Sequence, residues 1–139
     1  MTRIKTLGAD QHGAAAIEFA LAVPILVLFI YGIFQVGLLF QANAGMQHAL
    51  GEGARYATLC VPATDSCTLE SDTNVKAMIT SKLFGKSDGS FSVADPVTTT
   101  ASGSSYKTLK VQYTRRMNFL FFQGPNVTLT RQKIVYTPT

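Results

Sequence analysis

The most prominent feature of this sequence is a long apolar run near its N-terminus. From Phe19 to Phe40 no residue is charged, and Gln35 is the only strongly polar side chain. An α-helix of this length spans about 33 Å, at about 1.5 Å per residue, which is enough to cross the hydrocarbon core of a bilayer. The run is longer than the roughly 7–15 apolar residues of a cleaved secretory signal. The pattern predicts one transmembrane helix, kinked at Pro24, and no second span.

The sequence pattern predicts that the helix continues beyond the apolar run. Residues 41–59 contain no proline, and small residues recur there at every fourth position: Gly45, Ala49, Gly53 and Ala57. Such a repeat forms a smooth ridge on one helix face, along which another helix can approach closely. Each glycine costs about 1 kcal/mol of helix propensity relative to alanine, so close helix packing is expected to offset the cost. The alternative is a flexible, partly melted stalk, and Pro62 ends the helix in either case.

The remaining residues, 60–139, predict a small head that contains one further helix. Ser71 and its polar neighbours supply capping residues. Apolar side chains then follow at helical spacing, and Gly85 ends the run; the apolar positions are Val75, Met78, Ile79 and Leu83.

Alternating apolar and polar residues in the rest of the head predict short strands. Three segments show the alternation: 91–93, 109–114 and 127–136. Residues 97–105 are expected to form a polar loop or hairpin connection, and residues 124–126 (Gly-Pro-Asn) a turn between the last two strands. We therefore expect an α+β protein: a long N-terminal transmembrane and stalk helix, then a small head with one helix on a short, three-stranded antiparallel sheet.

The composition agrees with attachment to a membrane. Hydrophobic residues make up 47% of the chain and charged residues 14%, whereas roughly 25% of an ordinary soluble domain is charged. The mean hydropathy is +0.20. These values exclude a disordered chain, and the small, scattered net charge of +4 argues against a nucleic-acid partner. The lipid bilayer is the partner that the composition favours.

Charges before the apolar run predict the orientation of the helix. Arg3, Lys5 and the α-amino group outweigh Asp10, so by the positive-inside rule the N-terminus stays in the cytoplasm and the chain after Phe40 is translocated.

The two cysteines fit an oxidising compartment. Cys60 and Cys67 are the only cysteines and enclose a short loop, so a disulfide that closes this loop is expected outside the cytoplasm. The alternative is two unrelated thiols. No histidines lie near them, so they do not indicate a zinc site.

The residues that open the apolar run are the most informative. Glu18 places a carboxylate at the head of a membrane helix, which is costly unless the carboxylate reaches the interface or meets a partner. Gly13, four small or apolar residues and then Glu18-Phe19 resemble the cleavage site of type IV prepilins. The longer stretch from Gly13 to Leu59 resembles the TadE-like family of Tad/Flp pilus pseudopilins, in which a Glu-Phe pair opens the helix, a proline follows within it, and a segment like Ala54-Arg55-Tyr56-Ala57 lies past the membrane.

This resemblance implies a processing step and a set of partners. A prepilin peptidase would cut between Gly13 and Ala14, and Glu18 would pair with the new N-terminal amine of a neighbouring subunit. The implied partners are the peptidase, other pilins and pseudopilins, and the inner-membrane assembly platform. The implied organisation is a leader (1–13), a transmembrane helix (14–40), an extracytoplasmic helical stalk (41–59) and a head (60–139), in a bacterial inner membrane with the head on the periplasmic side.

The size of the head favours a minor pilin or pseudopilin, because major Flp pilins are very short and have almost no head. Two alternatives stay open. One is an uncleaved single-span envelope protein whose head binds a partner, and the other is a pseudopilin of a different secretion machine.

The sequence offers no basis for an enzyme. It has no Ser/His/Asp order, no paired-carboxylate site and no phosphate-binding loop, and His12 and His48 have no spaced partners. No catalytic residue, metal or cofactor is therefore expected. Residues 118–122 (Asn-Phe-Leu-Phe-Phe) form a concentrated apolar patch, either part of the head's core or a docking surface. Arg115 and Arg116 are expected to be a solvated strand end.

Overall fold

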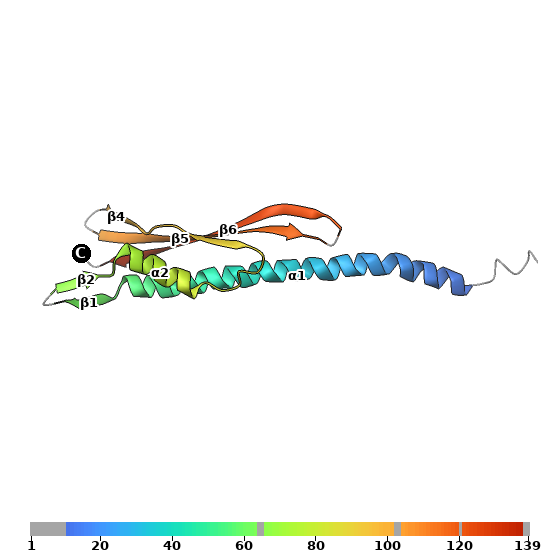
Figure 1. The fold of residues 1–139 in the computed structure, drawn as a ribbon, viewed down its shortest axis with the longest axis horizontal. Coiled ribbons are helices and arrows are strands. Elements are labelled where there is room, and N and C mark those ends of the chain that lie inside the picture. The colour runs from blue at the N-terminus through green and yellow to red at the C-terminus, as the bar shows by residue number, and fades with distance from the viewer. Residues whose placement is uncertain (1–10, 64–65, 102–103, 120, 138–139) are drawn as a thin grey trace, which may run out of the picture.

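The computed structural model describes residues 11–63, 66–101, 104–119 and 121–137. Its longest element is helix α1, Gln11–Ala57, which joins the apolar run and the residues beyond it without a break. The other elements follow in the order β1 (Cys60–Ala63), β2 (Ser66–Leu69), α2 (Asp72–Lys82), β3 (Ser90–Val93), β4 (Val97–Ala101), β5 (Ser104–Asn118) and β6 (Gln123–Thr137). They gather along the C-terminal part of α1, while its N-terminal part projects alone (Figure 1).

Strand β5 is the centre of the main sheet. Along one edge it pairs with β6 in an antiparallel ladder that runs from Ser105–Thr137 to Asn118–Gln123. The other edge is shared end to end by β3, which pairs with residues 111–114, and β4, which pairs with residues 104–108. The sheet is therefore three strands wide although four strands build it. This arrangement confirms the predicted fold class: a long apolar helix, then a small head with a short helix and an antiparallel sheet.

Two details of the strand prediction were wrong. Residues 97–101 form β4 rather than a loop, because the β-branched threonines suit an edge strand even without apolar alternation. The Gly-Pro-Asn segment at 124–126 lies inside β6, where an edge position tolerates a proline that cannot donate a hydrogen bond. The chain instead reverses between Asn118 and Gln123, which pair with each other, and the Phe119 N–H donates to the Phe122 carbonyl at 2.9 Å.

The segment between the two cysteines forms a second, two-stranded hairpin rather than an irregular loop. In its backbone register Cys60 lies opposite Leu69, and Cys67 lies opposite Pro62. The side chains of residues 60–67 lie outside those that the structure describes, so the disulfide stays a prediction.

A single core joins the head to α1. Both α2 and the sheet contact the same half of the helix. The buried apolar side chains are Ala42, Met46, Ala49, Leu50, Ala54 and Ala57 from α1, Val75 and Ile79 from α2, and Leu109, Val111, Tyr113 and Val135 from the sheet. The helix face that would be called a stalk is thus one wall of the head's hydrophobic core.

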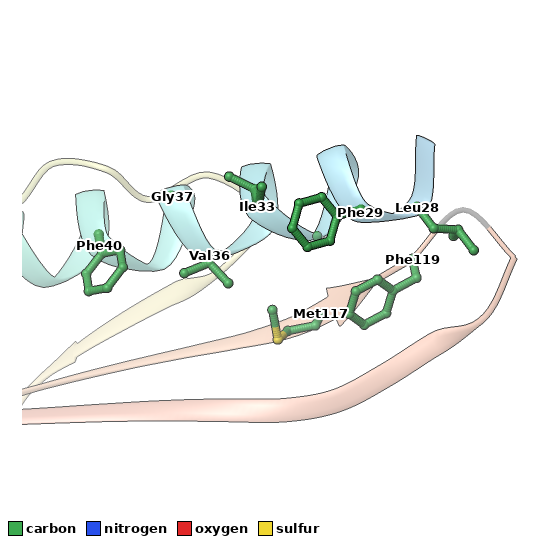
Figure 2. A pocket seen from close by; sticks show the side chains of 9 residues that line it. Leu28, Phe29, Ile33, Val36, Gly37, Phe40, Met117 and Phe119 are labelled. Carbon is green, nitrogen blue, oxygen red and sulfur yellow. The ribbon is translucent and has the colours of Figure 1, made fainter. Parts of the chain in front are cut away.

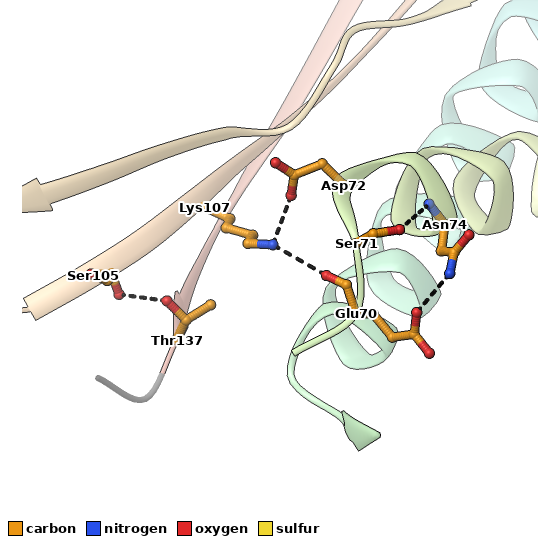
Figure 3. Close-up of polar contacts among 7 residues, drawn as sticks. All are labelled: Glu70, Ser71, Asp72, Asn74, Ser105, Lys107 and Thr137. Carbon is orange, nitrogen blue, oxygen red and sulfur yellow. Dashed lines mark hydrogen bonds and ion pairs between the residues drawn. The ribbon is translucent and has the colours of Figure 1, made fainter. Parts of the chain in front are cut away.

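Polar contacts hold the start of α2 against β5 (Figure 3). Ser71 caps the helix by accepting a hydrogen bond from the Asn74 N–H. Lys107 is only 8% exposed, and its ammonium donates to the Asp72 carboxylate at 2.7 Å and to the Glu70 carbonyl at 3.4 Å. A nearly buried lysine is tolerated here because its charge has a carboxylate partner.

The inner face of β5 also buries two polar side chains, those of Tyr113 and Arg115. The Tyr113 hydroxyl donates to the Lys86 carbonyl at 2.9 Å, and burial raises the pKa of this hydroxyl. Arg115 is 3% exposed, with Asp88 at 3.6 Å, which corrects the expectation of a solvated strand end for this residue. The cause is the strand alternation, since Arg115 continues the inward series of Leu109, Val111 and Tyr113. Its neighbour Arg116 is exposed.

Glycines on α1 offer a test of how closely the head approaches the helix. A methyl group on Gly45 would overlap the Phe84 carbonyl oxygen, whereas one on Gly51 would meet nothing within 4 Å. We expect Gly45→Ala to lower the free energy of unfolding of the head by about 1–3 kcal/mol through overpacking. The matched variant Gly51→Ala should raise it by about 1 kcal/mol, because alanine is the better helix former.

The measurement is thermal unfolding of the full chain in detergent micelles, followed by tyrosine fluorescence. Equal stability of the two variants would contradict the close approach at Gly45.

Candidate assembly site on the exposed half of the long helix

The N-terminal half of α1 presents apolar side chains to its surroundings. The helix is long and apolar enough to cross a membrane, and its most apolar segment is not buried by the rest of the described chain. Its exposed large hydrophobic residues include Ile17, Phe19, Leu21, Ile25, Leu26, Phe29, Ile30, Ile33 and Phe34. An apolar surface of this extent requires lipid or another protein to cover it.

The residues singled out at the start of the run all lie in the first turns of this helix. Gly13, Ala14, Glu18 and Phe19 are exposed, and Phe19 is 71% so. Apart from the adjacent residues and the local helix backbone, no described atom lies within 4 Å of the position that a Gly13 Cβ would take. Glu18 is one turn after Ala14, about 6 Å along the axis. Among the described residues, no hydrogen bond or ion pair engages the Glu18 carboxylate, and the residue is exposed.

The small-residue ridge lies elsewhere, on the half of α1 that the head covers. Gly45, Ala49, Gly53 and Ala57 are all buried. Gly45 faces the backbone of Phe84, and Gly53 faces the Ile79 side chain of α2 so closely that an added methyl would overlap it. The helix that approaches this ridge is therefore α2 of the same chain. The surface that α1 leaves for neighbours is the apolar part before the head.

Gln35 is the residue whose contact sequence reasoning missed. It is 2% exposed, and its Nε2 donates to the Asn118 carbonyl at 3.0 Å, where β5 ends. Its Oε1 has no protein partner in the described part of the chain. One feature of the sequence could have indicated that Gln35 has a partner: it is the one strongly polar side chain between Phe19 and Phe40.

An apolar groove of about 580 Å³ lies beside this contact, between α1 and the end of β5 (Figure 2). Its lining residues are Leu28, Phe29, Gly32, Ile33, Val36, Gly37, Phe40, Met117 and Phe119. None of them can titrate, so the groove suits an apolar occupant rather than acid–base chemistry. In the described ranges no three His, Cys, Asp or Glu residues form a group that could hold a metal ion.

Comparison with known proteins bears on this same half of the molecule. No curated protein and no solved structure matches the chain. A family model described as TadE-like protein matches residues 13–55. The matched region starts at the glycine before the apolar run and ends within the part of α1 that the head covers. It supports a membrane-anchored, pilin-like protein associated with a Tad pilus. The match confirms the resemblance seen in the sequence: residues 13–55 of this chain match the TadE-like family model.

Proposed function

We propose that this chain is a minor pilin or pseudopilin of a Tad/Flp-type pilus that acts in pilus assembly or initiation after a prepilin peptidase has cut it between Gly13 and Ala14. The observation that carries the proposal is the position of Gly13 and Glu18-Phe19. They open the exposed apolar half of α1, at the start of the TadE-like region.

The cleavage is a hydrolysis, in which water adds across the Gly13–Ala14 peptide bond and leaves a carboxylate on Gly13 and an ammonium on Ala14. Glycine before the bond has no side chain to obstruct the carboxylates of an aspartyl peptidase in the membrane. The exposure of Gly13 and the open space around it support access from the side of the helix.

The new ammonium gives Glu18 a partner. A carboxylate at the head of a membrane helix is destabilising when unpaired, and the N-terminal ammonium of a neighbouring subunit relieves that cost. The pair also favours one axial register between subunits, since a slip of one helical turn separates the two charges by about 5 Å. The outward-facing Glu18 carboxylate is free to make this contact.

The head supports a minor rather than a major role. It covers one face of α1 from about Gln35 to Ala57, so the apolar surface left to pack among neighbouring helices lies mainly on the preceding part of the helix. In a thin fibre, heads of this size cannot easily repeat at every position. We place the protein in a bacterial inner membrane, with its N-terminus in the cytoplasm and the head on the periplasmic side, where the assembly platform and other pilins are its partners.

Processing is tested by the mass of the mature chain with and without the cognate prepilin peptidase. We expect a chain that starts at Ala14 only when the peptidase is present. Gly13→Leu should keep the leader under both conditions, because a bulky side chain occupies the space before the bond. Gly32→Ala is the matched control, since its Cβ would also meet nothing within 4 Å, and it should be cut normally. A leader retained by the unaltered chain under both conditions would favour a plain membrane anchor.

The role of Glu18 is tested by Glu18→Ala, with the exposed Glu52→Ala on the same helix as its control. We expect the Glu18 variant to insert and be cut normally, while its recovery with sheared pili or with co-purified pilins falls at least about tenfold, which corresponds to about 1.4 kcal/mol. Recovery equal to that of the Glu52 variant would rule out the assigned role.

A further inference from the structure

The turn between β5 and β6 lies beside the apolar half of α1, beyond the rest of the head (Figure 1). We define the described residues 117–119 and 121–124 as the hairpin tip. Met117 and Phe119 line the groove against Phe29 and Val36 (Figure 2). The Asn118 carbonyl accepts the hydrogen bond from Gln35. The hairpin tip is therefore fixed next to a part of α1 that belongs to the predicted transmembrane run.

Helix geometry gives the depth of the hairpin tip. If Glu18 marks one boundary, a hydrocarbon core about 30 Å thick is crossed in about 20 residues and ends near Leu38. Gln35 then lies about 5 Å inside the boundary on the head's side, and Leu28 near the bilayer centre. The groove runs from Leu28 to Phe40, so the hairpin tip beside it lies within the leaflet on that side.

The chemistry of the hairpin tip matches this depth. No charged residue occurs from Met117 to Thr130, although Arg116 and Arg131 stand on either side of this stretch. Phe121 is 75% exposed and Phe122 57% exposed, and the Phe122 ring stacks on Phe119 with the ring centres 4.8 Å apart. Exposed aromatic rings of this kind are stabilised when lipid replaces the water around them, because apolar surface leaves water.

Three polar backbone groups of the hairpin tip are hydrogen-bonded within the chain. Polar backbone groups cost several kcal/mol in lipid unless they are hydrogen-bonded. The Phe119 N–H bonds to the Phe122 carbonyl, and the Asn118 carbonyl bonds to Gln35. Pro125, in the following strand, has no N–H to satisfy. These contacts give a reason for the one polar side chain in the apolar run.

We propose that the hairpin tip is embedded in the lipid leaflet on the head's side, with Phe121 and Phe122 in contact with acyl chains and an acyl chain in the groove between α1 and β5. This second membrane contact rests on the proposed insertion of α1. It fixes the depth at which the chain sits in the bilayer.

Single tryptophans test the proposal, because the chain has none of its own. The full chain is reconstituted in phosphatidylcholine vesicles with or without brominated acyl chains, which quench tryptophan on contact. Phe122→Trp and Phe121→Trp report on the hairpin tip, and Phe29→Trp on α1. Tyr136→Trp, a 72% exposed site at the far end of β6, reports on water.

We expect brominated lipid to quench both tryptophans of the hairpin tip at least half as strongly as the Phe29→Trp probe, and acrylamide in the water to quench them at least threefold less than the Tyr136→Trp probe. Quenching of the hairpin tip by acrylamide but not by brominated lipid would overturn the proposal. Protection from both quenchers would overturn it in favour of a contact with a second protein chain. If the Phe29→Trp probe is itself not quenched by lipid, the insertion of α1 has failed, which is a different result from failure of the hairpin tip alone.

Discussion

The close approach of the head to α1 is the contact on which the other features depend. Gly45 and Gly53 have no side chains, so Phe84 and Ile79 reach the helix surface itself. This proximity lets the sheet close over the same face, with Met46 and Leu50 filling the space between them. A head of this size has little core of its own, and α1 supplies one wall of it. The long helix is therefore both the membrane segment and a structural part of the head.

The same arrangement separates two surfaces along one helix. Where the head covers α1, the small residues are used within the chain. Before the head, large apolar side chains are left exposed, with Glu18 near their start. A surface of that kind is stable in lipid or against neighbouring helices, because both surroundings are apolar. Under the proposed pairing of Glu18, the two surroundings differ mainly in whether the carboxylate meets a cation, and that difference would favour moving a subunit from the bilayer into an assembly.

The sequence predicted the elements whose signals are local. The apolar run and the Ser71 cap led to α1 and α2, and the alternation around Val111 led to β5. Most of the wrong or missing predictions involve a partner that is distant in the chain. Thr98 and its neighbours form a strand because β5 offers an edge, and Pro125 is tolerated because β6 is paired on one side only. The inward position of Arg115 followed from the strand alternation, but its arginine side chain argued for solvent. The contact of Gln35 with Asn118 joins residues far apart in sequence, so no local pattern could indicate it.

The continuity of α1 has a further consequence for how the chain length can vary. The helix runs from Gln11 to Ala57 without a loop, so one inserted or deleted residue would turn the head by about 100° and shift it by about 1.5 Å relative to the N-terminal end. Insertions of seven or eleven residues nearly restore the angle but lift the head by about 10 or 16 Å. The number of residues between Glu18 and the first residues under the head therefore sets the distance and the angle between them. That number is constrained even where the identity of the apolar side chains is not.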